Sequence, residues 1–140
     1  MTTDEQYVQL LRETSKLIPL VDLGTCSKVY NLCMKHQLFE PINPIDFMLL
    51  LNIRETNAPV IIRSMKKARV CYLVYRLSKK ELNSMIREQW IKAILLTCGI
   101  DKDYYDSHYK DLDAGKSYKL KKEASKTNAE KFVEDIDSSI

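Results

Sequence analysis

Residues 43–51 read NPIDFMLLL and make the strongest local case for a helix in this chain. Asn43 is a favourable N-cap residue, and Pro44 follows at the first helical position, where its missing N–H costs least. Asp46 falls in the first turn, where a negative charge suits the positive end of the helix dipole. Because the residues that follow are all apolar, we expect this helix to lie near the centre of the fold.

Helical patterns extend from this stretch in both directions along the chain. Apolar side chains recur every three or four residues in five further segments, as expected for helices that bury one face. We expect helices over residues 4–18, 26–38, 58–77, 79–98 and 101–112.

Capping signals mark several of these expected helix ends. Thr25 is placed as the N-cap of the second helix, and Asn57-Ala58-Pro59 repeats the start signal for the fourth. Residues 78–81, SKKE, form a capping box for the fifth helix. Gly99 is placed to end the fifth helix in the left-handed conformation, and Asp101 to cap the sixth.

Residues 70–75, VCYLVY, allow two structures. Their β-branched and aromatic side chains also favour a strand, and periodicity alone does not separate a buried strand from a buried helix. The length of the surrounding pattern and the absence of turn residues favour a long helix.

These patterns predict an all-α protein, a compact bundle of five to six helices. Only three glycines and four prolines occur among 140 residues, which disfavours folds built from many tight turns. A chain of this length can bury a core without a metal ion or a disulfide. We expect that core to contain Leu10, Leu11, Val29, Tyr30, Cys33, Phe47, Leu50, Leu51, Tyr72, Leu73, Ile86, Trp90 and Ile94.

The composition changes after residue 112. Residues 113–131 hold six lysines and almost no large aliphatic side chains, so they offer too little apolar surface to offset the entropy of ordering. Residues 132–140 regain weak helical spacing, but a frayed terminus is the expected state. We therefore divide the chain into a helical domain, residues 1–112, and a lysine-rich, polar, partly disordered flexible tail, residues 113–140.

Positive charge is concentrated in residues 54–92, which carry ten Lys or Arg against three acids. That segment has a net charge of +7, whereas the whole chain has +3. A local excess of this size attracts phosphates or an acidic protein, although a solvated helical face would look the same. The candidate binding residues are Arg63, Lys66, Lys67, Arg69, Lys79 and Lys80.

No catalytic, metal or cofactor motif stands out. The four cysteines form no CxxC pair, and Cys26 and Cys33 lie two helical turns apart in an apolar stripe, which favours core packing over zinc binding. Cys33 and His36 are the nearest approach to a nucleophile and its base, but Cys33 falls late in its expected helix, away from the helix N-terminus that would stabilise a thiolate. We expect no enzyme activity, no metal and no cofactor.

Residues 94–110 resemble a helix-turn-helix segment in outline, with an apolar helix, a turn at Gly99 and a second helix capped by Asp101. The sequence departs from that pattern at Leu95, where a small residue would let the helices cross closely. The second helix also carries four acids, which would repel phosphates. If DNA or RNA binds, we expect it on the basic face of residues 63–80 instead.

The expected function is that of a small non-catalytic binding or regulatory protein that acts through a protein partner. The alternative is a nucleic-acid-binding protein, such as a bacterial or phage accessory factor, that uses the basic face of residues 63–80. The longest apolar run, residues 47–51, is far shorter than the ~20 residues of a membrane span, and residues 1–6 do not resemble a signal peptide. We expect a cytoplasmic protein that does not bind membranes.

Overall fold

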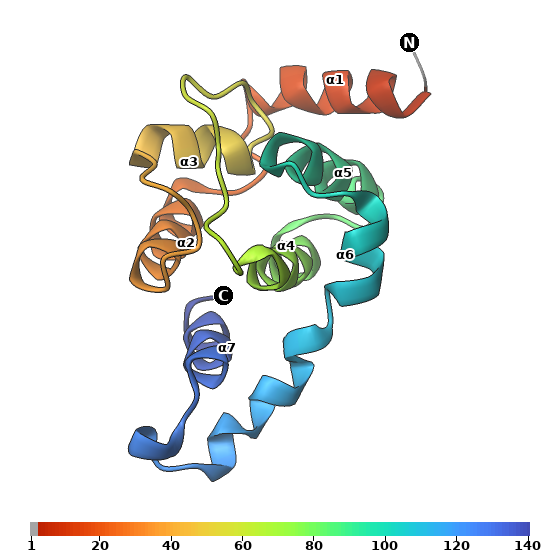
Figure 1. The fold of residues 1–140 in the computed structure, drawn as a ribbon. Coiled ribbons are helices and arrows are strands. Elements are labelled where there is room, and N and C mark those ends of the chain that lie inside the picture. The colour runs from red at the N-terminus through yellow and green to blue at the C-terminus, as the bar shows by residue number, and fades with distance from the viewer. Residues whose placement is uncertain (1–2) are drawn as a thin grey trace.

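A computed structural model describes residues 3–140, and every regular element in that range is helical apart from one isolated β-bridge (Figure 1). The all-α class and the bundle architecture are confirmed. The α-helices are α1 (Thr3–Ser15), α2 (Leu23–Lys35), α3 (Pro44–Leu51), α4 (Lys67–Glu81), α5 (Arg87–Cys98), α6 (Lys102–His108) and α7 (Asn128–Ser139). Two 3-10 helices, η1 (Asp111–Leu120) and η2 (Glu123–Ser125), connect α6 to α7.

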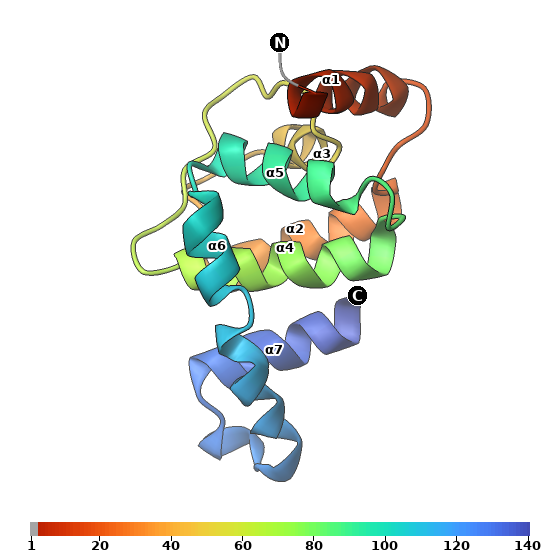
Figure 2. The same cartoon turned by 90° about the vertical axis from the view of Figure 1, so that its right-hand side faces the viewer.

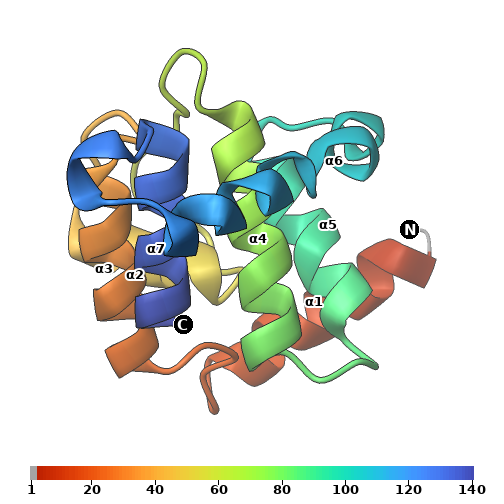
Figure 3. The ribbon, with the colours of Figure 1, turned by 90° about the horizontal axis from the view of Figure 1, so that it is seen from below.

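The helices are stacked in layers around α2 and α4. Helices α3 and α5 lie on one side of this pair, and α1 lies outside α5 at the edge of the bundle (Figures 1 and 2). On the opposite side α7 packs against α2, and η1 crosses α4 (Figure 3). None of the described helices is both long and apolar enough to cross a membrane.

Helix α3 has the position and the caps that its sequence predicts. The Asn43 side chain accepts a hydrogen bond from the backbone N–H of Asp46 at 2.8 Å, and Pro44 occupies the first turn. Phe47, Leu50 and Leu51 are buried, as expected. Asp46 is also buried, and it accepts a 2.8 Å hydrogen bond from the backbone N–H of Asn57, which fastens the loop after α3 to the start of the helix.

The prediction that a helix begins at Ala58 was wrong, because α4 begins at Lys67. Residues 58–66 are extended or form a turn, and they lie beside residues 38–40. Backbone hydrogen bonds join Glu40 N–H to the Ile61 carbonyl at 2.8 Å and Arg63 N–H to the Leu38 carbonyl at 2.9 Å. Pro59 and the β-branched residues after it favour this extended backbone. Residues 70–75 are helical and, except for half-buried Tyr75, buried.

Two expected N-caps are also corrected. Helix α2 is capped by Asp22, whose carboxylate accepts a 2.8 Å hydrogen bond from the N–H of Thr25, the residue we expected to be the cap. Ser78 is not a cap, because α4 continues through it to Glu81 and its hydroxyl donates to the Tyr75 carbonyl at 2.7 Å. The expected end of α5 is confirmed, since Gly99 has a φ of 72°.

The core prediction holds in the centre of the bundle and fails at its edge. Trp90 and Phe47 are buried, whereas Leu10 is 61% exposed. Helix α1 packs mainly against α5, so one narrow face of it is covered and Leu11 is buried on that face. Tyr30 and Ile86 are half-buried at the surface of the same core.

The expectation of an unpacked tail is corrected by α7. Phe132, Val133 and Ile136 recur at helical spacing and are completely buried. Thr127 and Glu130 form a capping box at the start of the helix. The helical spacing noted in residues 132–140 is therefore that of a packed helix, and the expected frayed terminus was wrong.

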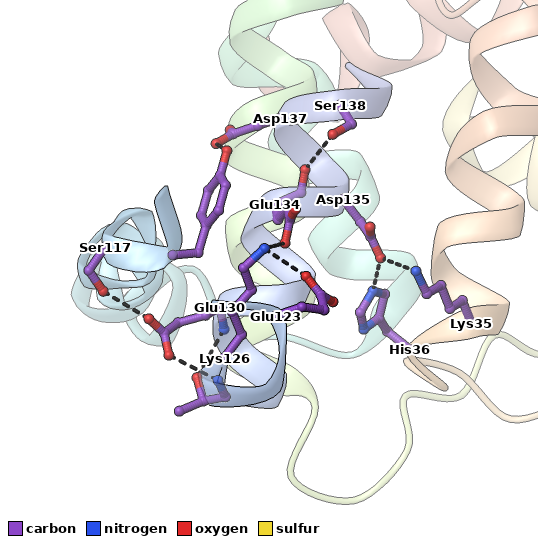
Figure 4. A network of polar contacts seen from close by, with 12 residues as sticks. Lys35, His36, Ser117, Glu123, Lys126, Glu130, Glu134, Asp135, Asp137 and Ser138 are labelled. Atoms are coloured by element: carbon purple, nitrogen blue, oxygen red, sulfur yellow. Dashed lines mark hydrogen bonds and ion pairs between the residues drawn. The ribbon is translucent and has the colours of Figure 1, made fainter. Parts of the chain in front are cut away.

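Polar contacts around α7 complete its attachment to the rest of the protein (Figure 4). Asp135 Oδ2 lies 2.6 Å from His36 Nε2 and 2.8 Å from Lys35 Nζ, both on or next to α2. Asp137 lies 2.7 Å from a guanidinium nitrogen of Arg76 on α4. The acids of α7 therefore neutralise cations on both helices of the layer beneath it.

Burial of α7 is tested by Phe132→Ala. We expect this substitution to lower the free energy of unfolding by about 3–5 kcal/mol, because it leaves a cavity under a fully buried ring. The matched control is Leu120→Ala, which truncates a side chain that is 91% exposed and should change stability by less than about 0.5 kcal/mol. Urea denaturation measures both, and equal stabilities for the two variants would show that α7 does not pack.

The Glu130 carboxylate provides a second test through pH. The backbone N–H of Thr127 and the ammonium group of Lys121 each donate to Glu130 Oε1 at 2.9 Å, and these contacts lower its pKa from an ordinary 4.5 to about 2. A carboxyl group with a lower pKa in the folded state stabilises the protein above pH 4.5 and loses this contribution as the pH falls towards 2. We expect Glu130→Gln to lose less stability over that range than the parent in thermal unfolding. If the stability of the two proteins changed equally with pH, the lowered pKa of Glu130 would be contradicted.

Candidate functional site

The loop before α4 carries the first of the expected binding residues. Arg63 is half-buried, and its Nε donates to the Phe39 carbonyl at 3.0 Å, which fixes one edge of the guanidinium group. The turn that follows brings Lys66 back towards Arg63, since the Lys66 N–H donates to the Arg63 carbonyl at 3.1 Å. Met65 in this turn has a φ of 66° and a side chain that is 94% exposed.

Arg63, Lys66 and Arg69 form a cluster of like charges at this end of α4. The pKa of Lys66 is lowered by burial and by the positive charges of Arg69 and Arg63. The geometry differs from the expected basic face of one helix, because Arg63 and Lys66 precede α4 and only Lys67 and Arg69 lie on it. The extended loop and the helix together bring the three charges to the same place.

In the part of the chain that the structure describes, this cluster has no acidic counterpart. Across residues 3–140, no carboxylate lies within ion-pair distance of Arg63, Lys66, Lys67 or Arg69. Arg76, two turns further along α4, is paired with Asp137 at 2.7 Å. The positive end of the α4 dipole adds to the repulsion, so this arrangement destabilises the folded protein. A bound anion would relieve this repulsion, and salt would screen it.

Lys67 is exposed and extends the cluster towards α6. Its Nζ lies 5.0 Å from the centroid of the Tyr104 ring, within the range of a cation–π interaction. The ring of His108 lies 4.3 Å from that of Tyr104 on the same helix. Tyr104 is not among the binding residues predicted from the sequence. The four-residue spacing of Tyr104 and His108 shows that they share a helical face but does not show that the face meets Lys67.

Lys79 and Lys80 do not join the cluster. Both are exposed near the C-terminal end of α4, about 20 Å from Lys67 at the helical rise of 1.5 Å per residue. Lys79 Nζ lies 4.7 Å from the centroid of the Tyr75 ring, and Lys110 Nζ lies 6.0 Å from the same centroid. The expected basic face is therefore two groups of cations at opposite ends of α4.

Acidic residues bound the site on the side of α6. Asp101, Asp103, Asp106 and Asp111 are all exposed. Two of them have side-chain partners, since Lys102 Nζ contacts Asp106 at 2.6 Å and a ring nitrogen of His108 contacts Asp111 at 2.7 Å. Leu95, the residue that departs from the helix-turn-helix pattern, is buried in α5. An anion would therefore approach from the side of α4 and the loop before it.

The cysteines lie in the core. All four are free and buried, and burial raises the pKa of Cys26 to about 11 and those of Cys71 and Cys98 to about 12. Burial also raises the pKa of Cys33, which disfavours the thiolate needed for nucleophilic attack. His36 contacts Asp135 and the edge of Phe132. Within residues 3–140, no three His, Cys, Asp or Glu side chains are grouped as metal ligands.

An apolar groove lies between α2 and α3, away from the cation cluster. Its volume is about 350 Å³, and no charged side chain lines it. Leu23 and Ile45, at its rim, are more than 60% exposed. The groove offers a partner protein apolar surface to bury but no charge that would select one.

If the three cations repel one another, removing one of them should raise the free energy of unfolding. We expect Lys66→Gln to raise the free energy of unfolding by about 0.5 kcal/mol at low ionic strength, because one of three repelling charges is removed. The gain should shrink above about 0.5 M salt, where the Debye length is only a few ångströms. Lys119→Gln, at an exposed lysine, is the control for the loss of one charge. A Lys66→Gln variant no more stable than the control at low salt would contradict the repulsion.

Comparison of the chain with protein-family models, with curated proteins and with solved structures found no match. The function is therefore inferred from the chemistry of the sites themselves.

Proposed function

We propose that this protein is a non-catalytic nucleic-acid-binding protein that holds backbone phosphates at the end of α4. The observation that supports the proposal is the cluster of Arg63, Lys66 and Arg69, three cations that repel one another and have no carboxylate partner among the described residues. Such a cluster costs stability unless an anion binds, and phosphate oxygens are the acceptors that guanidinium groups bind in pairs.

The position of the two arginines suits phosphate binding. Each is half-buried, so each is partly shielded from water and loses less side-chain entropy on binding than a fully mobile residue would. Arg63 uses Nε to hold the Phe39 carbonyl, which leaves its two terminal nitrogens for a ligand. Lys66 and Lys67 would add charge without imposing a direction.

The arrangement along α4 favours a polymer over a single anion. Lys79 and Lys80 lie about 20 Å from Lys67, a distance that a strand carrying a phosphate at every nucleotide would span. The exposed acids of α6 would repel such a strand from one side and so direct it along α4. An acidic partner protein could bind the same cations. We also propose that the protein is cytoplasmic.

The proposal is tested by the charge reversals Lys66→Glu and Lys67→Glu combined. We expect the wild-type chain to bind a 20-nucleotide single strand or duplex with an affinity that falls steeply with salt, because each phosphate contact releases a counterion. The double variant should bind at least about tenfold more weakly and with a shallower salt dependence. Fluorescence anisotropy at two salt concentrations measures both quantities.

The matched control reverses Lys119 and Lys122, two exposed lysines outside the site, and so changes the net charge equally. If both double variants lose affinity equally, the attraction is general and the site is wrong. If neither nucleic acid binds but poly-glutamate does, the partner is an acidic protein and the nucleic-acid proposal fails.

A further inference from the structure

A polar cavity of about 640 Å³ lies where α1, α5 and the segment after α3 meet. Sites for small molecules commonly have volumes of about 300–1,000 Å³. The cavity lies outside the cation cluster of α4 and shares no residue with it. Its lining residues are Gln9, Arg12, Glu13, Lys16, Arg54, Glu55, Thr56 and Thr97.

A strained turn positions the two arginines of this cavity. Ile53 has a φ of 53°, a left-handed conformation that is costly for a β-branched residue. Its side chain is buried, and the backbone N–H groups of Ile53 and Arg54 donate to the carbonyls of Leu50 and Leu49 at 3.0 and 2.8 Å. Burial and these hydrogen bonds hold a turn that would normally require glycine.

The same turn orients Arg12. The Ile53 carbonyl accepts a 2.7 Å hydrogen bond from Arg12 Nε, so the terminal nitrogens of Arg12 are left for the cavity. Arg54, the next residue in the chain, is half-buried and lines the cavity as well. In the described part of the chain, neither guanidinium group has a carboxylate within ion-pair distance.

The remaining lining groups indicate which chemical groups a ligand would carry besides the one bound by the arginines. Glu13 is already bound by Lys16 at 3.2 Å and by Gln9 at 3.1 Å. The hydroxyls of Thr56 and Thr97 donate to backbone carbonyls, so only their lone pairs are left to accept hydrogen bonds. Together with the exposed carboxylate of Glu55, they would receive hydroxyl or amino groups.

We propose that this cavity binds a small polar molecule with an oxyanion group, either a phosphate or a carboxylate, that Arg12 and Arg54 hold. The same molecule carries hydroxyl or amino groups that face Thr56, Thr97 and Glu55. The paired terminal nitrogens of a guanidinium group match both kinds of oxyanion. This inference is independent of nucleic-acid binding at α4.

Calorimetric titration with ribose 5-phosphate and with citrate tests this site and distinguishes the two oxyanions. We expect one of the two to bind the full-length protein with a dissociation constant of about 1 mM or lower. Arg54→Gln should weaken that binding at least about tenfold. Its side chain makes no hydrogen bond or ion pair in the described residues, so the variant should fold normally, and its thermal unfolding checks this.

Two controls separate this site from the cation cluster. Lys28→Gln removes one charge at an exposed lysine outside the cavity and should leave binding unchanged. The Lys66→Glu, Lys67→Glu variant should also bind normally, even if it has lost nucleic-acid binding. The proposal is overturned if neither probe binds at about 10 mM, if Arg54→Gln binds like the wild type, or if the α4 variant abolishes binding.

Discussion

The C-terminal end of α3 is the point on which the arrangement of the bundle depends. The Leu51 carbonyl accepts a 2.7 Å hydrogen bond from the indole N–H of Trp90 on α5. The Asn52 side chain accepts hydrogen bonds from the N–H groups of Leu20 and Val21, which connect α1 to α2. The carbonyls at a helix end have no partner within the helix and must find one elsewhere. At Leu51 that requirement joins α3 to α5, and the Asn52 side chain joins the end of α3 to the connection between α1 and α2.

Structure that depends on neighbouring residues, such as a helix cap, could be predicted from the sequence. Structure that depends on contacts between distant segments could not. The start of α3 was predicted because its cap, its proline and its first acid lie within four residues of one another. The extended path of residues 58–66 depends on hydrogen bonds to residues 38–40, more than twenty positions earlier. The burial of Phe132 depends on α2 in the same way. Neither partner can be inferred from the composition of the segment itself.

The candidate site shows the same division. The cations at the start of α4 were identified from charge alone, but the expected helical face does not exist, because Arg63 and Lys66 lie outside the helix. Tyr104 was missed because its proximity to Lys67 arises from the packing of α6 on α4. Arg12 and Arg54 were missed for a related reason, since they are 42 positions apart and meet only after α1 has docked.

Among the described residues, two of the three non-glycine residues with a left-handed backbone lie next to an unneutralised cation, and the third, Gln37, precedes Leu38. Met65 and Ile53 have left-handed backbone conformations that cost roughly 1–3 kcal/mol each, and each directly precedes a cation without an acidic partner in residues 3–140, Lys66 or Arg54. Other cations are neutralised, as α7 does for Lys35 and Arg76. The chain therefore has acids that stabilise positive charge at some places and lacks them at others. Arg63, Arg69, Arg12 and Arg54 are half-buried, so leaving them without a carboxylate costs more than it does at the exposed lysines, and this contrast supports the proposals that these two places bind anions.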